Sequence, residues 1–315
     1  MHPALSVIIF TTASGAGYGL LALSGLFAAV DWLPRDGSAG GWAIGSALVL
    51  VTGGLLASTA HLGRPERAWR ALSQWRTSWL SREGLLALAS YVPALVFLAG
   101  WLLPEAVPWG PWGLLAAVAA LLTVYATGKI YATLTPIPAW NNGLVVPGYL
   151  VLGGLGGMQI LSLIMAATDH YHERFGWIVL LFATCAALVK HGYWRDIART
   201  RSETGSATAT GLGAGGERVR LLDAPHTTDN FVMREMGYRI ARRHATRLRQ
   251  ICTSTLFAVP AMLALVSTLI DNWFGLVVTT ALATASVAIG TLIERWLFFA
   301  EARHVVTAYY GSETV

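Results

Sequence analysis

The chain alternates between long apolar runs and short polar segments, and eight of the runs reach about the 20 residues that a helix needs to cross a bilayer. The eight predicted spans cover residues 5–30, 42–60, 84–103, 112–134, 146–168, 175–194, 251–270 and 274–299. A helix satisfies its own backbone hydrogen bonds, which hydrocarbon cannot do for it. The pattern therefore predicts an all-α polytopic membrane protein, in which residues 1–315 form one integral-membrane domain with a bundle of eight transmembrane helices.

The polar segment at residues 61–83 joins the second and third spans. Pro65 is suited to the first turn of a helix. Four apolar side chains follow it at spacings of three or four residues: Trp69, Leu72, Trp75 and Trp79. This spacing places them on one side of a helix and the arginines on the other. We predict a helix that lies at the membrane interface and closes a pocket between the two spans.

Residues 195–250 are the one long polar interruption. They begin with a stretch rich in Ser, Thr, Gly and Ala, which is predicted to be mobile. They end in a basic segment, residues 233–250, whose apolar positions recur near helical spacing and predict an amphipathic surface helix. This helix either enforces topology as a solvated or headgroup-bound element, or serves as a docking surface for an acidic partner.

The composition indicates a membrane protein. Hydrophobic residues make up 55% of the chain and charged residues only 12%, against about 25% charged in soluble domains. The net charge of +5 does not indicate nucleic-acid binding, because a basic binding face does not need apolar runs of this length.

The two cysteines, Cys185 and Cys252, form no Cys-x-x-Cys pair, so no iron–sulfur cluster is expected in this chain itself. The first apolar run lacks the basic start of a cleaved signal and is expected to be a retained helix.

The arginines are distributed unevenly between the two sides of the predicted bundle. The 61–83 segment contains five of them and residues 195–250 contain eleven, whereas the loops on the opposite side contain only Arg35 and Arg174. Loops rich in Lys and Arg stay in the cytoplasm. Both termini and both arginine-rich loops are therefore predicted to be cytoplasmic.

Seven ionisable side chains fall near one set of span ends: His61, Glu83, Lys129, Lys190, His191, Glu294 and Arg295. Such groups at membrane depth are costly and are candidates for function. In the simplest interpretation Lys129 and Arg295 extend to the interface, Glu294 neutralises one of them, and His61 is a packed interfacial histidine. Because all seven lie near the same ends, several of them can meet.

A histidine and a carboxylate at a membrane edge suit a quinone site. The histidine can donate to a quinone oxygen, since its ordinary pKa is about 6.5, and a glutamate can exchange protons with water. A slot lined by tryptophan and tyrosine would hold the ring. His61 and His191 also permit a second hypothesis, a haem held by two histidines. A third, a transporter, expects charges near mid-membrane, whereas here they gather at one edge.

Several short stretches of sequence point to one family: HLGRP at 61–65, RA at 67–68, SRE at 81–83, VY at 124–125, IYAT at 130–133 and IPAW at 137–140. They resemble the membrane-anchor subunit of bacterial dimethyl sulfoxide reductase. LIER at 292–295 adds weaker support, and the eight spans also fit. The resemblance covers most of the chain except residues 195–250, which are longer and more basic than the family suggests.

The resemblance implies a function. Anchors of this family lie in the bacterial cytoplasmic membrane, bind menaquinone or ubiquinone, and carry no haem. They hold a ferredoxin-like iron–sulfur subunit that connects to a molybdopterin catalytic subunit. The quinol-associated histidine of the family corresponds to His61 and its acidic residue to Glu83. Arg64, Tyr131 and Trp140 lie in the shared motifs and complete the predicted quinone site.

Two directions of electron flow stay open. The motifs match the reductase anchor, in which quinol is oxidised and dimethyl sulfoxide is reduced. Related anchors serve cytoplasmic molybdenum complexes that oxidise sulfite and reduce quinone. The basic cytoplasmic side predicted here, which also contains His61 and Glu83, would suit a cytoplasmic catalytic dimer.

Overall fold

A computed structural model describes residues 4–35, 38–60, 62–103, 110–199 and 240–310, together with a few isolated positions between 200 and 239. Within these residues the regular structure is entirely helical, and eight helices are long and apolar enough to cross a membrane. The predicted eight-span, all-α fold is thereby confirmed. His61 and most of the loop at residues 195–250 lie outside the described residues.

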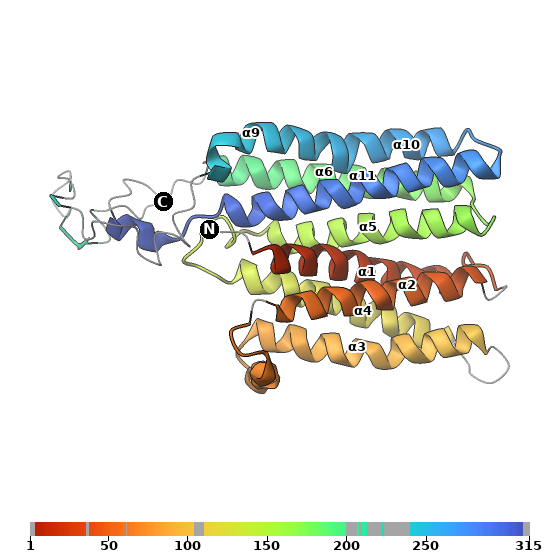
Figure 1. Cartoon of the computed structure of the whole chain (residues 1–315), viewed down its shortest axis with the longest axis horizontal. Helices are drawn as coiled ribbons and strands as arrows, with labels where there is room; N and C mark the ends of the chain where they lie inside the picture. The colour runs from red at the N-terminus through yellow and green to blue at the C-terminus, as the bar shows by residue number, and fades with distance from the viewer. Residues whose placement is uncertain are drawn as a thin grey trace.

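The helices form two groups of four, stacked side by side (Figure 1). The first group consists of α1 (Leu5–Ala29), α2 (Ser38–Thr59), α3 (Trp79–Leu102) and α4 (Gly110–Ala132). The second consists of α5 (Val145–Ala167), α6 (Glu173–Arg199), the seventh span α9–α10 (Ile240–Thr253 and Val259–Ser267) and α11 (Trp273–Ala300). Helices α1 and α5 pack on each other and join the two groups. Together they form the core of the bundle.

The two joining helices end in the same way. Asp31 follows α1 with φ 54° and Asp169 follows α5 with φ 61°, both in the left-handed region. Just beyond them, the Trp32 N–H donates to the Phe27 carbonyl at 2.8 Å and the His170 N–H to the Met165 carbonyl at 2.7 Å. These bonds cap carbonyls that the helix ends would otherwise leave unpaired. The first helix of each group therefore ends in the same kind of C-terminal cap, although no internal repeat is evident in the sequence.

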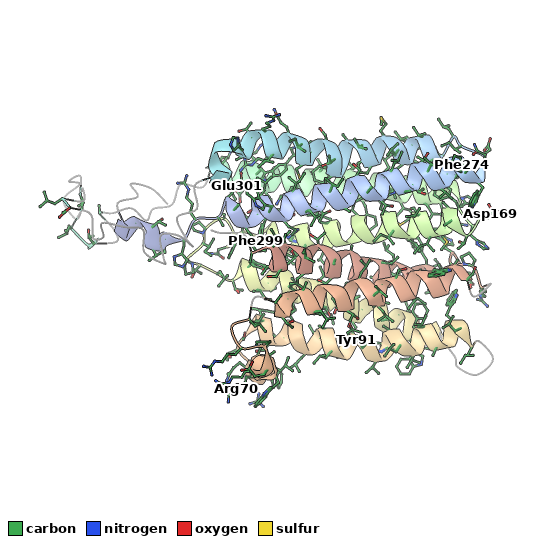
Figure 2. All side chains as sticks on the ribbon, viewed as in Figure 1. Arg70, Tyr91, Asp169, Phe274, Phe299 and Glu301 are labelled. Atoms are coloured by element: carbon green, nitrogen blue, oxygen red, sulfur yellow. The ribbon has the colours of Figure 1, made fainter. Side chains whose placement is uncertain are left out.

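One end of the bundle holds most of the candidate residues. Helix α1 begins there and α11 ends there, and the short 3₁₀ helix η1 (Pro65–Gln74) covers part of it (Figure 1). Figure 2 shows Arg70, Phe299 and Glu301 at this end and Asp169 and Phe274 at the other. We call it the η1 end.

The predicted interfacial helix starts at Pro65 as expected, but it differs in form. It is a 3₁₀ helix that stops at Gln74, and Trp79 belongs to α3 instead. Because a 3₁₀ helix has three residues per turn, Trp69 and Leu72 still lie on one side of it, but Trp79 belongs to α3 and does not continue that row. Trp69 is 66% exposed. Arg82 fastens the segment to α3, since its guanidinium donates to the carbonyls of Trp75 and Arg76 at 2.9 and 2.7 Å.

The predicted basic surface helix is not a separate element in its described part. Helix α9 begins at Ile240 and runs through a π-helical turn, η2 (Ser254–Ala258), into α10, so residues 240–250 form the start of the seventh span. Pro260 lacks an N–H for the carbonyl four residues before it, and a π turn accommodates such a break. The wider turn frees the Thr255 carbonyl, which accepts a hydrogen bond from the Ser286 hydroxyl of α11 at 2.6 Å.

Close packing of α1 on α5 depends on glycine. A Cβ atom at Gly19 would lie 1.9 Å from the carbonyl oxygen of Gly153, and one at Gly157 would lie 2.2 Å from the backbone of Gly19. Small residues allow helix backbones to approach in this way within a membrane.

We expect Gly19→Ala to force α1 and α5 apart and to lower stability by about 1–3 kcal/mol, the usual cost of overpacking. The matched control is Gly53→Ala in α2, where a Cβ atom would meet no atom within 4 Å. The thermal stability of both variants can be measured in detergent. Equal stability of Gly19→Ala and the wild type would contradict the packing seen here.

Candidate functional site

Glu83 lies in the second turn of α3 and is only 5% exposed. The Thr127 hydroxyl of α4 donates to its Oε1 at 2.5 Å and also lies 3.0 Å from the Thr123 carbonyl. A protonated carboxyl could instead donate to the Thr127 oxygen, which would then donate to the Thr123 carbonyl. The same heavy-atom positions therefore serve both protonation states, as a group that exchanges protons requires.

Tyr131 and Trp140 meet in an aromatic cluster at the η1 end, together with Tyr149, Phe298 and Phe299. The ring centroids of Tyr131 and Trp140 are 5.2 Å apart, and Tyr131 stacks on Tyr149 at 5.7 Å. The Trp140 indole N–H donates to the Phe298 carbonyl at 3.0 Å, which ties the α4–α5 loop to α11. Tyr131 and Trp140 thus pack mainly against other rings.

Helix α4 connects this aromatic cluster to Glu83. Thr127 and Tyr131 are four residues apart on α4, so both side chains lie on one face of that helix. Thr127 is the hydrogen-bond partner of Glu83, and the Tyr131 ring contacts the Trp140 ring. Three of the predicted site residues, Glu83, Tyr131 and Trp140, are therefore brought into one neighbourhood.

The remaining predicted residues lie apart from this neighbourhood or outside the described part. Arg64 is exposed on the segment that leads into η1. His61 lies outside the described residues. His191 is on α6 in the other helix group, where its ring nitrogens lie 2.8 Å from the Ala187 carbonyl and 3.5 Å from the Thr253 hydroxyl. The haem hypothesis, which also needs His61, stays a prediction.

A buried ion cluster joins α6 to α11. The Glu294 carboxylate contacts the Lys190 ammonium and the Arg295 guanidinium, the latter at 2.8 Å. Arg295 also lies over the Tyr149 ring, 3.9 Å from its centroid. The interpretation that Arg295 extends to the interface is wrong, because its side chain is 3% exposed. Glu294 does neutralise a cation, and it contacts two.

His304 follows α11 at the η1 end and was not among the predicted residues. Its Nδ1 accepts a hydrogen bond from the Val306 N–H at 3.1 Å. The Val305 N–H donates to the Pro136 carbonyl at 3.0 Å, which attaches the 3₁₀ helix η3 (Val305–Tyr310) to the α4–α5 loop. Partial burial lowers the pKa of His304 below its ordinary value.

Sequence reasoning missed Thr127 and Tyr149. The helical spacing between Thr127 and Tyr131 could have indicated the first. No sequence signal indicates Tyr149, because its contacts with Tyr131 and Arg295 come from two other helices.

Comparison with known proteins gives consistent results. The family model for the DMSO reductase anchor subunit (DmsC) matches residues 1–301. The C subunit of the sulfite dehydrogenase of Allochromatium vinosum is 34% identical over 339 aligned residues, which span 99% of both proteins. The corresponding C component of the anaerobic dimethyl sulfoxide reductase of Haemophilus influenzae is 28% identical over 144 residues, covering 45% of this protein and 51% of the relative. The protein therefore belongs to the DmsC family of membrane-anchor subunits.

Proposed function

We propose that this anchor carries a quinone-reactive site and passes electrons between the quinone pool and an iron–sulfur subunit of a molybdenum complex. The observation that carries the proposal is the position of Glu83. Its buried carboxyl, hydrogen-bonded to Thr127, lies in the second turn of α3, next to the arginine-rich η1. A proton-exchanging group is needed at such a place, because quinone reduction takes up protons together with electrons.

A bound quinone accepts two electrons and two protons and becomes a quinol. Glu83 would supply or receive a proton, with Thr127 keeping its hydrogen bond in both states. The aromatic cluster excludes water around Tyr131 and Trp140 and supplies apolar surface near the site. His61 stays a candidate donor at the aqueous edge, because it follows the last residue of α2, Thr59, by two positions.

We further propose that the complex oxidises sulfite and reduces quinone. Support comes from the sulfite dehydrogenase relative, which is similar along 99% of both proteins, whereas the dimethyl sulfoxide reductase relative is similar over about half. In this direction a catalytic partner converts sulfite and water into sulfate, two protons and two electrons. The electrons pass through an iron–sulfur partner to the quinone.

The catalytic partners would dock in the cytoplasm at the η1 end. The arginine-rich loops favour a cytoplasmic location for this end. Electron transfer slows steeply with distance, so the iron–sulfur partner belongs on the same side as Glu83. The two arginines of η1, Arg67 and Arg70, are exposed and offer a basic surface there. Attraction to an acidic partner would weaken as salt screens it.

Membrane vesicles of opposite orientation test two assignments together: the direction of electron flow and the side of the membrane on which the catalytic partners dock. We expect sulfite to drive reduction of ubiquinone-1 in inverted vesicles, where the cytoplasmic face is outside, and not in right-side-out vesicles, because the sulfite dianion does not cross the bilayer. Membranes that lack this protein provide the control.

Two results would count against these assignments separately. Sulfite activity confined to right-side-out vesicles would reverse the orientation. Quinol-dependent reduction of dimethyl sulfoxide without any sulfite activity would reverse the direction of electron flow.

A further inference from the structure

An open pocket of about 480 Å³ lies between α6 and α9. These two helices form one edge of the bundle, and η1 lies at the opposite edge (Figure 1). The residues that line the pocket carry polar or aromatic side chains: His191, Trp194, Thr246, Arg249, Gln250, Thr253 and Ser254. Glu83, Tyr131 and Trp140 do not line it, so the proposed quinone site does not account for it.

Arg249 is held in place by two neighbours at the side of this pocket. Its Nε and Nη2 donate to the Glu301 carboxylate at 3.1 and 3.0 Å, and its guanidinium lies over the Trp194 ring. A guanidinium has five N–H donors, and its pair with Glu301 leaves Nη1 free to donate elsewhere. The Arg249 side chain is 30% exposed. It can therefore bind a ligand in the pocket while it stays paired.

His191 presents one ring nitrogen to the pocket. Its Nδ1 lies 2.8 Å from the Ala187 carbonyl, and it must be the donor there because a carbonyl only accepts. Its Nε2 lies 3.5 Å from the hydroxyl of Thr253, another lining residue. When the ring is protonated, Nε2 also donates. An anion in the pocket would therefore meet a donor from α6 and a donor from α9.

Further cations lie on the turns just beyond the pocket. Arg195 is one turn above His191 on α6, and Arg247 is three residues before Gln250 on α9, which places each beside a lining residue. Both arginines are exposed. Within the described part of the chain, neither forms an ion pair. Their charges are therefore available to a ligand at the mouth of the pocket.

The carboxylates at this end of α6 and α11 do not cancel these charges. Asp196 accepts a hydrogen bond from the Asn142 amide of the α4–α5 loop at 2.5 Å. Glu301 already pairs with Arg249. Cations around the pocket thus outnumber acidic groups, and the surplus favours a ligand with a negative charge.

The pocket lies at the level of lipid headgroups. Helix α6 has 27 residues, a length of about 40 Å, whereas the hydrocarbon core of a bilayer is about 30 Å thick. Its last turns carry Arg195 and Arg199, so the extra length extends beyond the hydrocarbon at the η1 end. Leu188, one turn closer to the middle of α6 than His191, is 70% exposed, and Ile251 of α9 is also exposed. Apolar surface suited to acyl chains therefore begins directly next to the pocket.

We infer that this pocket binds the headgroup of an anionic phospholipid. The phosphate contacts Arg249 and His191, and the acyl chains lie along the outer faces of α6 and α9–α10. Basic pockets between membrane helices are suited to such headgroups. A soluble phosphate compound would leave the adjacent apolar surface unused. The inference does not depend on the proposed function, because it concerns another edge of the bundle.

Native mass spectrometry of the full chain, delipidated in mild detergent, tests the inference. We expect one molecule of dioleoylphosphatidylglycerol to stay bound, and dioleoylphosphatidylcholine to bind at least about 5-fold more weakly, because its headgroup has no net charge. Equal affinity for the two lipids would overturn the inference, since it would show that the negative charge is not recognised.

Charge variants test the position of the site. Arg195→Gln combined with Arg247→Gln should weaken the binding of dioleoylphosphatidylglycerol at least about 10-fold, and the corresponding lysine variant should keep most of it. Arg67→Gln combined with Arg70→Gln is the matched control, because it removes the same charge at the opposite edge. An equal loss in the control would assign binding to general surface charge and overturn the inference.

Filling the pocket tests its shape without changing its charge. Thr246 is exposed and lines the pocket, so Thr246→Trp should also weaken binding at least about 10-fold. Thr77→Trp, at an exposed threonine just after η1, is the control and should bind like the wild type. Wild-type affinity in Thr246→Trp would place the lipid elsewhere. If Thr246→Trp unfolds in detergent, the arginine variants decide.

Two competitors distinguish other occupants. Inorganic phosphate at millimolar concentration should not displace dioleoylphosphatidylglycerol, and displacement would assign the pocket to a soluble phosphate compound. The lipid should also stay bound in the complex assembled with the partner subunits. Its loss on assembly would assign the pocket to a partner subunit. Either result would overturn the inference.

Discussion

A complex with Glu83→Gln is expected to exchange electrons with quinone at least about 100-fold more slowly than the wild type, the usual contribution of a positioned acid–base group. Glutamine keeps the shape of the side chain and can still bond to Thr127, but it cannot carry a proton. Folding should survive, because the substitution leaves no buried charge. The rate of ubiquinone-1 reduction by the assembled complex measures the effect.

Three further variants separate proton exchange from packing. Glu83→Asp keeps a carboxyl and should retain part of the rate with a changed pH profile. Thr127→Val should slow the reaction less than Glu83→Gln does, because water or another group can replace one hydrogen bond. Glu66→Gln, at an exposed glutamate of η1, should behave as the wild type. A normal rate in a correctly assembled Glu83→Gln complex would remove Glu83 from the mechanism.

The second large effect, a loss of stability, is expected when Glu294 is substituted. Glu294→Gln removes the only carboxylate that contacts Lys190 and Arg295 among the described residues and leaves two buried cations without a counter-charge. Breaking a buried ion pair by removing one partner costs about 3–5 kcal/mol. The variant should be much less stable in detergent and should assemble poorly with its partners.

Two control variants change the charge of other ionisable groups. Asp31→Asn removes the carboxylate of an exposed pair with Arg35 and should have little effect. Lys190→Met combined with Glu294→Gln removes one of the two unbalanced cations, so the double variant should be more stable than Glu294→Gln alone. Equal thermal stability of Glu294→Gln and the wild type would show that the cluster does not support the fold.

The sequence by itself determined the number and approximate limits of the membrane helices. The thickness of the bilayer requires about 20 apolar residues per helix, and composition alone reveals such runs. The eighth span was predicted at 274–299, and α11 occupies Trp273–Ala300. The third was predicted to begin at residue 84, yet α3 begins at Trp79. Its polar first turns resemble loop sequence; the Ser78 hydroxyl caps the helix there, and Arg82 bonds to the carbonyls of Trp75 and Arg76.

The motif residues were also accessible from the sequence, because the family pattern marks Glu83, Tyr131 and Trp140 directly. That these residues lie near one another was partly predictable, because residues near the same ends of their spans lie at a similar depth in the membrane. The depth of a residue in the membrane does not determine how its helix is rotated about its own axis. Each residue turns a helix by about 100°, so the side that a residue faces depends on how its helix packs against the others.

Only the tertiary structure decided those rotations. It paired Glu294 with Lys190 and Arg295, where the sequence suggested an arginine reaching the interface. It placed Thr127 against Glu83, and it brought Arg295 of α11 over the Tyr149 ring of α5. The physical reason lies in close packing: glycines such as Gly19 let the backbones of α1 and α5 approach closely, and the way the helices pack sets which side chains meet.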